Sequence, residues 1–453
     1  MRTAARKCRS AVKLWRPASR ARSALAYISE PEHEARCTGN EPEAGFVGAP
    51  GSRYVSEMKF FYPHVDHVPP ILPCFRLVDD LGRLVEGAEQ HLPVLNEELL
   101  QKLQTTMIRV SEYDKVFNDA QRQGRISFYL VSRGEEACSI GSCAALDPRD
   151  LLLPQYRELG ALLWRGFTCH DVANQLTSNA LDPAHGRQLP LHIGSKEKSI
   201  VYIKSTLGTQ CPHAAGASYA LKLQRTSRIS LCYFGDGTSS HADVPSALNI
   251  AAVHKCPTIF FCRNNGYAIS TNVADQYVSD GVAPRGIAFG MPTIRIDGND
   301  MLAVFAATQR AREIALQESR PVLIEAMTYR IGAHSTSDDD SKYRTKKSPH
   351  AGWDSERAFW ESRSPIIRFG RYLQSKGLFS VHREEELRKA ARREAIDALN
   401  LAERAAKPDY SHMFTDVYDE LSWVQHEQQN KLKAHVQKYA HKYADIMPQL
   451  VSL

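Results

Sequence analysis

Two polar motifs hold the residues of this sequence whose types and spacing best suit chemistry. Asp236, flanked by glycines, follows the apolar run 229–234, and the pair Asn264-Asn265 follows the apolar run 258–262. Both runs have the length and composition of buried strands, with a helix-like stretch between them. Because ligands of parallel sheets bind outside the carboxyl ends of the strands, we expect the two motifs to meet there. A carboxylate and an amide carbonyl are hard oxygen donors, which suit Mg²⁺ that also holds a diphosphate.

Each motif alone has a simpler interpretation. Gly-Asp-Gly is a common tight turn, and Asn265-Gly266 is a favourable turn dipeptide. At the ends of two consecutive predicted strands, however, the pair of motifs favours a shared cofactor site. This arrangement is similar to the signature of thiamine diphosphate enzymes.

The elements that would position these motifs alternate between helices and strands. Helical patterns cover 94–122, with Asn96 as a candidate N-cap, and then 158–178, 212–225, 246–254 and 300–318. Strand patterns cover 229–234, 258–262 and 321–330. This order predicts an α/β fold with a doubly wound parallel sheet and a helical C-terminal region.

The same patterns divide the chain into four regions. These are a presequence and linker (1–55), an N-terminal extension with helices (56–150), a thiamine diphosphate-binding core (151–350) and a helical C-terminal region (351–453).

Positive charge is concentrated at the N-terminus. The formal net charge is +6, but the first acidic residue is Glu30, and the residues before it are rich in Arg, Lys, Ser and Ala. This pattern is typical of a mitochondrial presequence, and the alternative is a disordered basic tail. Without this segment the positive excess disappears, so we expect no nucleic-acid partner. No apolar run is long enough to span a membrane.

The cysteines point to a reducing compartment. The chain has 10 cysteines without a Cys-x-x-Cys pair, and several lie in or beside predicted core strands. Free Cys behaves there as a small apolar residue, which argues against a zinc site.

Four longer motifs connect the chain to a family. They are Gly124-Arg-Ile-Ser-Phe128, Gln155-Tyr-Arg-Glu158, the stretch 262–271 and the stretch 328–338. Through them, residues 58–440 resemble the alpha subunit of the branched-chain 2-oxoacid dehydrogenase decarboxylase component. The resemblance implies thiamine diphosphate and Mg²⁺ as cofactors and oxidative decarboxylation of branched-chain 2-oxoacids in Val, Leu and Ile catabolism. It places the enzyme in the mitochondrial matrix, where the acyl group passes to lipoyl groups on an acyltransferase core.

The resemblance also implies a partner subunit. In this family the activating Glu lies on a beta subunit, and two alpha and two beta subunits form a heterotetramer with the cofactor sites at their interfaces. The chain alone is then expected to be inactive.

Individual residues receive roles by the same resemblance. Asp236, Asn265 and the backbone carbonyl of Tyr267 would bind Mg²⁺. The two arginines and the histidine of the cofactor set would neutralise the diphosphate, and Leu207 would hold the thiamine in its bent shape. The cofactor set is Tyr156, Arg157, Ser205, Leu207, Gly237, Thr238, Arg263 and His334, of which His334 is also assigned a catalytic role.

A polar loop at 333–341 resembles the family's phosphorylation loop. Ser335 occupies the modified position and Thr345 a second one, which implies a regulatory kinase and phosphatase. A phosphate on Ser335 would bring a charge of roughly −1.5 to −2 beside His334 and several acidic residues. We expect this repulsion to disorder the loop and to block lipoyl docking. The alternative is an unmodified acidic loop.

Several residues depart from the family pattern. His241 stands where members of the family are acidic, Pro245 where they often have His, and Ala333 also replaces a frequent His. At the family's potassium site Lys204 replaces a Ser, and the other ligands would be Thr206, Thr209 and Gln210. The Lys204 ammonium could exclude potassium and substitute for its charge, or it could point to solvent.

Three other functions compete with this interpretation. A pyruvate dehydrogenase alpha subunit shares the cofactor motif, but usually has Asp-Pro-Gly where this chain has Asp338-Asp339-Asp340. A divergent, non-catalytic subunit that binds the beta chain is disfavoured by the intact Asp236, Asn265 and His334. A nicotinamide-binding oxidoreductase is disfavoured because no Gly-x-Gly-x-x-Gly opens a helix after a strand.

Overall fold

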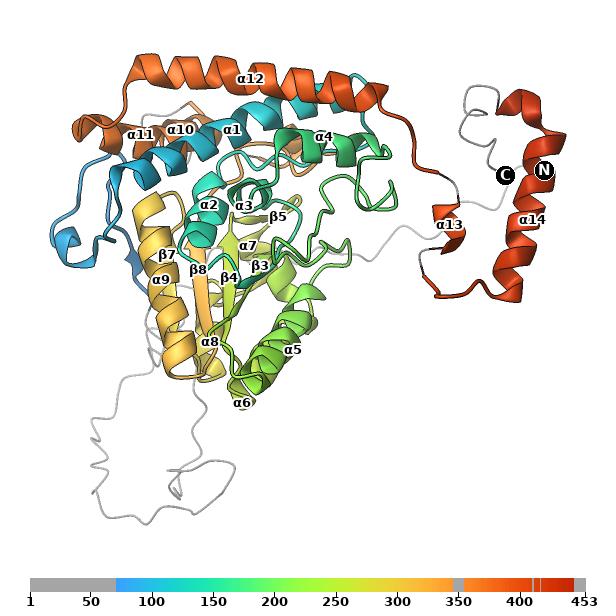
Figure 1. The fold of residues 1–453 in the computed structure, drawn as a ribbon. Helices are drawn as coiled ribbons and strands as arrows, with labels where there is room; N and C mark the ends of the chain where they lie inside the picture. Colours follow the sequence, from blue (N-terminus) through green and yellow to red (C-terminus); the bar gives the residue numbers. More distant parts are fainter. Residues whose placement is uncertain (1–70, 345–353, 410, 416, 444–453) are drawn as a thin grey trace, which may run out of the picture. The chain divides into compact units, whose positions relative to one another are not determined.

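A computed structural model describes residues 71–344, 354–409, 411–415 and 417–443. The chain divides into the units Met1–Val68 and Pro69–Leu453, and every described residue belongs to the second unit. The predicted presequence and linker (1–55) and the second predicted phosphorylation site, Thr345, lie outside the described residues. The second unit has an α/β fold, as the alternation of helices and strands predicted (Figure 1).

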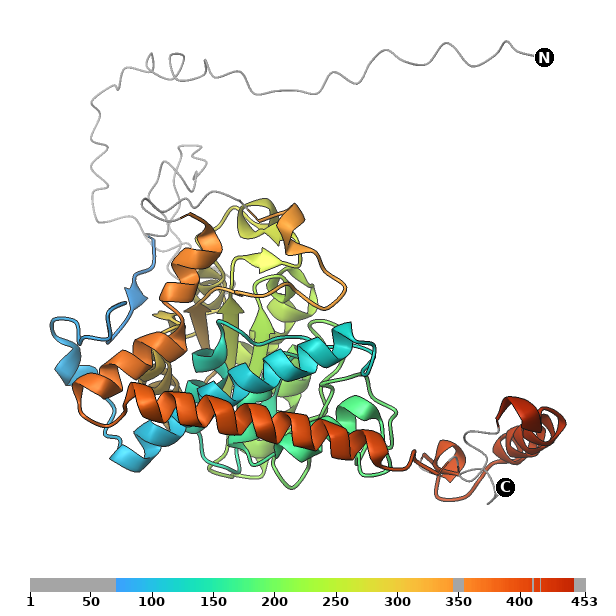
Figure 2. The same cartoon turned by 90° about the horizontal axis from the view of Figure 1, so that it is seen from above.

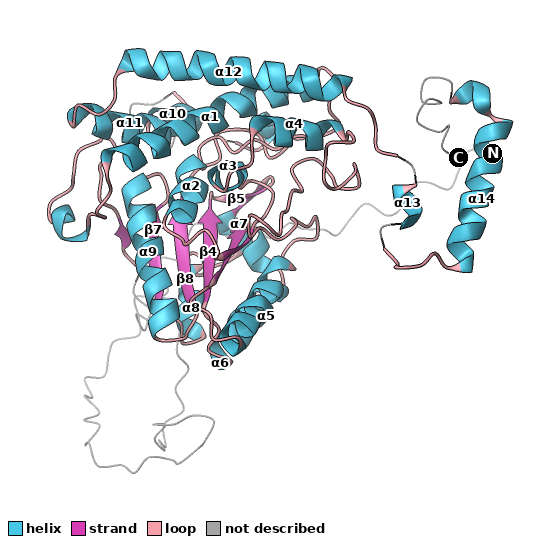
Figure 3. Ribbon diagram, viewed as in Figure 1, coloured by secondary structure: helices cyan, strands magenta, loops and turns pink. Residues whose placement is uncertain are grey.

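The described residues contain a 6-stranded sheet in the order β1-β7-β8-β4-β3-β2. Figure 3 shows the strands in magenta. Its strands are β1 Cys74–Phe75, β2 Leu151–Leu153, β3 Ser230–Gly235, β4 Thr258–Asn264, β7 Thr293–Asp297 and β8 Val322–Met327. Every pairing in this sheet is parallel, and Gly235 of β3 lies opposite Arg263 of β4. The carboxyl ends of β3 and β4, which carry the two motifs, therefore lie side by side. A short antiparallel hairpin follows β4, formed by β5 (Tyr267–Ala268) and β6 (Thr271–Asn272).

Helices cover both faces of the sheet (Figure 1). The core on one face draws on α1 (Glu97–Arg122), α2 (Glu136–Ala144), α3 (Leu159–Trp164), α4 (Cys169–Thr177), α9 (Met301–Gln317), α11 (Pro365–Ser375) and α12 (Val381–Arg404). The other face carries α5 (Gln210–Leu223), α6 (Asp243–Val253) and α8 (Ala283–Ala288). Figure 2 shows α12 running alongside α1. The other described helices are α7 (Val273–Gln276), α10 (Glu356–Ser362), α13 (His412–Thr415) and α14 (Trp423–Lys438).

The side chains of β3 are buried on both faces of the sheet, which explains why helices are needed on both. Leu231 and Tyr233 belong to the core of the first face, whereas Cys232 and Phe234 belong to the core of the second. Successive side chains of a strand point to opposite faces, so a strand that is apolar throughout must be covered on both. The apolar runs therefore build the sheet, and the polar motifs follow where the strands end.

Most predicted helices are present with shifted ends. Helix α1 begins after Asn96, whose side chain accepts a hydrogen bond from the Leu99 N–H. The predicted helix 158–178 is wrong as one helix, because Gly166 adopts a φ of +90° and Thr168 starts α4 with a capping box. Helix α6 begins earlier than predicted, and its first turn contains Pro245, where proline is tolerated.

One hydrophobic core joins the predicted regions after residue 55. It contains Leu77, Leu231 and Leu399, which come from the predicted N-terminal, cofactor-binding and C-terminal regions. The region boundaries at 150 and 350 stay predictions. Among the helices that the structure describes, none has the length and apolar character to cross a membrane.

Candidate active site

A cavity of 340 Å³ lies where β2, β3, β4 and β8 end. It is lined by Gln155, Tyr156, Arg157, Ser205, Leu207, Gly235, Asp236, Gly237, Thr238, Arg263, Asn265, Tyr267, Ala268, Ile269, Arg330 and His334. The structure thus brings together every residue predicted to bind thiamine diphosphate or Mg²⁺. Their roles toward these groups stay predictions.

Gln155 ties the ends of β2 and β3 together beside the cavity. Its Nε2 donates to Thr238 Oγ1 at 3.0 Å, and its Oε1 accepts from the Gly235 N–H at 3.0 Å. These bonds fix the turn through Gly237. A Cβ at Gly237 would stand 2.6 Å from the Ala268 Cβ, so a glycine is needed for the β5–β6 hairpin to approach this turn.

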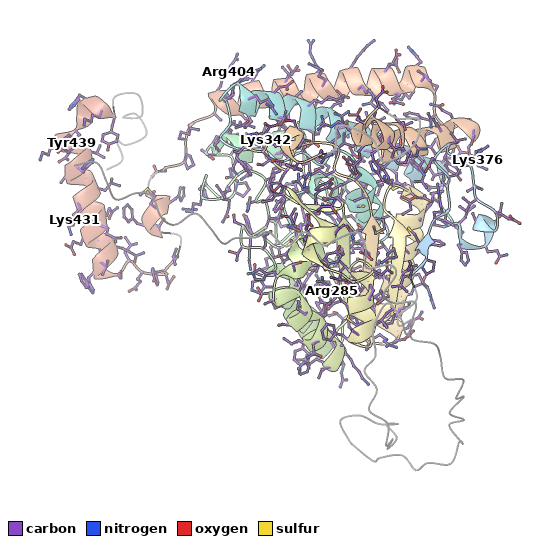
Figure 4. The ribbon with its side chains drawn as sticks, turned by 180° about the vertical axis from the view of Figure 1, so that it is seen from behind. Arg285, Lys342, Lys376, Arg404, Lys431 and Tyr439 are labelled. Carbon is purple, nitrogen blue, oxygen red and sulfur yellow. The ribbon has the colours of Figure 1, made fainter. Side chains whose placement is uncertain are left out.

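Asp236 is a buried carboxylate held by amide groups. It is 1% exposed and accepts from the Asn265 N–H at 3.3 Å and from Gln276 Nε2 at 3.2 Å. Burial raises its pKa to about 6, although the Gln276 hydrogen bond opposes this shift. A divalent cation beside Asp236 would favour its ionised form. Arg285 of α8, labelled in Figure 4, donates to the Ser239 carbonyl in the following turn and braces it.

Asn264 connects the ends of β4 and β8. Its Nδ2 donates to Glu325 Oε1 on β8 at 2.8 Å, and its Oδ1 accepts from the Gly266 N–H at 3.2 Å. Of the two asparagines in the motif, Asn265 is the one that lines the cavity.

Asn265 has partners at both atoms of its amide. Its Nδ2 donates to Glu135 Oε1 at 2.8 Å, and its Oδ1 accepts from the Tyr267 N–H at 3.1 Å. Together with its backbone bond to Asp236, these contacts hold the side chain in one place. The two oxygen donors predicted from the motifs therefore share one cleft.

Tyr156, Arg157 and His334 form one wall of the cavity. The Tyr156 hydroxyl lies 3.2 Å from His334 Nε2, and Arg157 Nη2 donates to the His334 carbonyl. Burial and the charges of Arg157 and Arg330 lower the pKa of His334 to about 3, although nearby carboxylates oppose this. His334 is therefore neutral near pH 7, and one of its ring nitrogens is an acceptor.

Arg263 is buried between two carboxylates. Its Nη1 contacts Glu135 Oε2, and its Nε lies 2.6 Å from Glu158 Oε1 in an ion pair that is not an aligned hydrogen bond. Burial alone would raise the pKa of Glu135, but Arg263 and Arg157 hold it below its usual range. Burial raises the pKa of Glu158. Arg263 thus lines the cavity while much of its charge is balanced within the protein.

Sequence reasoning did not assign a role to several other polar residues at this site, among them Arg330, Gln155 and Glu135. Arg330 is 1% exposed and donates to the Ile269 carbonyl at 2.8 Å. Arg330 and Gln155 both lie inside the motifs that carry the family resemblance, so membership of a motif was the available signal. Glu135 is 130 residues from Asn265 in sequence, and no local pattern indicates it.

The residues predicted for potassium lie in or just before the first turn of α5. Thr209 Oγ1 donates to the Thr206 carbonyl at 3.0 Å, and Gln210 Nε2 donates to a β3 carbonyl at 3.1 Å. Lys204 is exposed, and its Nζ lies 2.6 Å from Nδ1 of His213, a residue whose pKa is lowered by burial and by this ammonium. The ammonium is thus near the surface, and a potassium site here stays a prediction.

The loop that carries Ser335 is held by several contacts. The His334 N–H donates to Asp338 Oδ2 at 2.7 Å, and the Tyr343 hydroxyl donates to the same oxygen at 2.5 Å. Ser335 itself is half-buried. Ser335 also lines a second cavity, of 240 Å³.

The three other departures from the family pattern lie outside the cavity lining. His241 is exposed, and its Nδ1 lies 3.5 Å from Asp243 Oδ2. Pro245 lies in the first turn of α6, and Ala333 is half-buried beside His334. Among the described residues that line the cavity, these three are not found.

The donor set fits thiamine diphosphate held with Mg²⁺. Mg²⁺ in such sites takes one or two carboxylates and completes its shell with phosphate oxygens and water. Within the described part of the chain, no group of three or more His, Cys, Asp and Glu side chains gathers to hold a metal. Among the described residues that line the cavity, Asp236 is the only carboxylate, and Arg157 and Arg263 share this lining, which suits a cation that arrives with a phosphate group.

Comparison with known proteins defines the class. Residues 104–411 match the family described as "Dehydrogenase E1 component", and the chain belongs to this family. The matched stretch contains every residue of the cavity lining.

Individual relatives are more specific. The chain is 46% identical over 375 residues to "2-oxoisovalerate dehydrogenase subunit alpha, mitochondrial" of Caenorhabditis elegans, covering 83% of this chain and 85% of that protein. It is 40% identical over 449 residues to the protein of the same name from Mus musculus, covering 96% and 98%. The corresponding human protein is 41% identical over 421 residues, covering 92% and 91%.

Proposed function

We propose that the chain is the alpha subunit of the thiamine diphosphate-dependent decarboxylase of the branched-chain 2-oxoacid dehydrogenase complex. The observation that carries this proposal is the meeting of Asp236 and Asn265, from two strands, in one cavity with buried basic residues. The names of the relatives supply the substrate class, because 2-oxoisovalerate is a branched-chain 2-oxoacid. The relatives are mitochondrial proteins, which supports a mitochondrial location for this chain, and residues 1–55 are proposed as its presequence and linker.

The residues of this chain bind and orient the cofactor. Bound thiamine diphosphate supplies the electron sink that lets a 2-oxo acid lose carbon dioxide. Arg157 and Arg263 supply positive charge for its diphosphate, and neutral His334 can add a hydrogen bond. Leu207, which lines the cavity and is 39% exposed, would support the thiamine.

Two ions belong to the proposal. Mg²⁺ would be held by Asp236, Asn265 Oδ1 and the Tyr267 carbonyl, with diphosphate oxygens completing its shell. Potassium would be held at the start of α5 by oxygens of Thr206, Thr209 and Gln210. A rise in melting temperature with KCl beyond that with NaCl would support the potassium site, and equal effects of the two salts would count against it.

A beta subunit is the proposed partner, and it would cover the cavity mouth. Leu207 and Ile269 of the lining are 39% and 52% exposed, so the cavity wall continues onto the surface. Helices α5 and α6 start near this mouth, and their C-terminal halves present an apolar surface, here called the α5–α6 face. It comprises Tyr219, Leu223, Ile250 and Val253, which are 41–69% exposed. Contiguous exposed apolar residues mark protein interfaces, and the relatives are named as alpha subunits.

The proposal extends to transfer and regulation. The acyl group would pass to a lipoyl group on an acyltransferase core. A kinase and a phosphatase would act on Ser335, whose phosphate would disturb the His334–Asp338 contact of its loop. Ser335→Glu is expected to lower overall activity, whereas Ser337→Glu, at an exposed position of the same loop, should have little effect. Equal activity of both variants would refute the switch.

The decisive experiment is co-expression with a beta subunit followed by a decarboxylation assay. We expect release of carbon dioxide from 3-methyl-2-oxobutanoate that depends on thiamine diphosphate and Mg²⁺, and none from the alpha chain alone. A preference for pyruvate would favour a pyruvate dehydrogenase alpha subunit instead. An assembled but inactive complex that binds no cofactor would favour the non-catalytic role.

A further inference from the structure

Glu135 is a buried carboxylate to which the proposed function gives no role. It directly precedes α2, and its side chain is 1% exposed. The preceding residue, Gly134, has a φ of +96°, and a Cβ there would collide with the Tyr329 carbonyl oxygen, so glycine is required. Thr328 Oγ1 also donates to the Gly134 carbonyl at 3.0 Å. These contacts hold the backbone before Glu135 close to the segment that follows β8.

The two oxygens of Glu135 contact two residues at the end of β4. Oε1 accepts from Asn265 Nδ2 at 2.8 Å, and Oε2 contacts Arg263 Nη1. An ionised carboxylate can only accept hydrogen bonds, so the amide atom of Asn265 that faces it must be the nitrogen. The amide oxygen then faces the other way, where it accepts from the Tyr267 N–H at 3.1 Å.

This orientation matters because the two ends of an asparagine amide have nearly the same shape. An amide that turns over would present an NH₂ group where its oxygen had been. An NH₂ group cannot ligate Mg²⁺, which takes oxygen ligands. Because Glu135 can only accept, it keeps the Asn265 nitrogen on its own side. The amide oxygen is then available on the other side.

Arg263 keeps Glu135 in the form that imposes this constraint. Arg263 Nη1 contacts Oε2 of Glu135, and both side chains are buried, so the carboxylate is paired with a fixed positive charge. A protonated carboxyl group could donate as well as accept, and the constraint on Asn265 would be lost.

We infer that Glu135 is a positioning residue of the metal site, which holds Asn265 so that its amide oxygen is presented to the divalent cation. The inference rests on the proposed function, because it takes Asp236 and Asn265 as ligands of Mg²⁺ bound with thiamine diphosphate. Outer partners of this kind orient metal ligands and contribute to metal affinity without touching the metal.

Glu158 provides a matched comparison within the same site. Its side chain is 0% exposed, and its Oε1 lies 2.6 Å from Arg263 Nε, so it too is a buried carboxylate paired with this arginine. It approaches Arg263 from the Nε side, whereas Glu135 lies between Nη1 and Asn265. Removing either charge should disturb Arg263, but only the loss of Glu135 should free the Asn265 amide.

The test measures Mn²⁺ binding as a probe for Mg²⁺. Free Mn²⁺ is followed by electron paramagnetic resonance in the purified alpha–beta assembly with excess thiamine diphosphate. Glu135→Gln is expected to weaken Mn²⁺ binding about 10- to 100-fold, and Glu158→Gln is expected to bind Mn²⁺ nearly as the wild type does. Adding Asn265→Asp to Glu135→Gln should restore tight binding, because a carboxylate presents oxygen on either side. Unfolding of each variant without metal reports its stability separately.

The outcomes separate this inference from the proposed function. Wild-type Mn²⁺ affinity in Glu135→Gln would overturn the inference, and so would an equal loss in both glutamine variants. A wild-type assembly that binds no Mn²⁺ with thiamine diphosphate would instead overturn the proposed function. If Glu135→Gln does not fold, Glu135→Asp keeps the charge but withdraws it from Asn265. Weaker Mn²⁺ binding by that variant would support the inference, and unchanged binding would overturn it.

Discussion

At the scale of single residues, burial moves two cavity side chains toward their neutral forms. It raises the pKa of Asp236 to about 6 and lowers that of His334 to about 3. Arg263 is also buried, yet carboxylate partners keep it charged. The fixed positive charge of the cavity therefore comes from arginine, whose planar donors suit a diphosphate.

His334 should leave a signature in the acid dependence of stability. Its pKa is about 3 in the folded chain against an ordinary value of 6.5. Between these values the unfolded state binds more protons, so His334 makes stability fall as pH falls below 6.5. His334→Asn removes this contribution. Urea unfolding from about pH 7 to about pH 4 should show the variant losing less stability than the wild type.

The control for this experiment is His241→Asn, which changes an exposed histidine. Its stability should follow the wild type over the same pH range. Parallel curves for the wild type and His334→Asn would contradict the shift assigned to His334.

Much of the candidate site could be predicted because its residues lie within a few contiguous motifs. Asp236, Asn265 and Arg157 are each adjacent to a strand end or a family motif, so local sequence indicates them. Glu135 and Gln276 could not be predicted, because only folding brings them beside Asn265 and Asp236. Their importance comes from a tertiary contact that has no sequence pattern.

At the scale of elements, β7 shows why part of the fold escaped prediction. Its sequence, Thr-Ile-Arg-Ile-Asp, is short and contains the charged residues Arg295 and Asp297, so it was not predicted as a buried strand. In the structure the Arg295 side chain is only 8% exposed, because Glu325 of β8 and Asp280 pair with it at 2.9 Å. The apolar runs 229–234 and 258–262 needed no such partners, so β3 and β4 were predicted from them.

The turn after β3 and the β5–β6 hairpin should be sensitive to a single methyl group. In Gly237→Ala the new Cβ would stand 2.6 Å from the Ala268 Cβ, so the hairpin must shift. We expect a loss of about 1–3 kcal/mol in the free energy of unfolding. Denaturant unfolding of the full-length chain measures this change.

Gly216→Ala is the matched control. Gly216 lies inside α5, and no neighbouring atom lies within 4 Å of the position of its added Cβ. Alanine should therefore stabilise the helix by roughly 0.5–1 kcal/mol. Destabilisation of both variants by the same amount would refute the steric argument for Gly237.

At the scale of the whole molecule, the α5–α6 face and the cavity mouth form the proposed docking surface for the beta subunit. Charge on this face should break the assembly. Ile250 is 46% exposed, and the beta subunit would cover it. Ile250→Glu puts a carboxylate at this position. We expect a cost of about 2 kcal/mol or more, roughly a 30-fold weaker association of alpha and beta chains. Analytical ultracentrifugation of the co-expressed chains measures it.

Leu401→Glu is the control for this prediction. Leu401 lies on α12 and is 57% exposed, so it receives the same change on a different helix. Leu401→Glu should leave the association of the alpha and beta chains unchanged. Equal weakening by both variants, or by neither, would contradict the location of the docking surface.

The sequence Asn265-Gly266 has a chemical consequence that reaches beyond function. In a flexible peptide, the glycine nitrogen attacks the side-chain carbon of the preceding asparagine, and ammonia leaves through a succinimide. Here the Gly266 N–H is bound by Asn264, and both amide atoms of Asn265 are engaged. The folded structure thus protects Asn265-Gly266 from deamidation. A deamidated Asn265 therefore indicates that the chain has spent time unfolded. Mass spectrometry should find it after incubation in denaturant and not in native buffer.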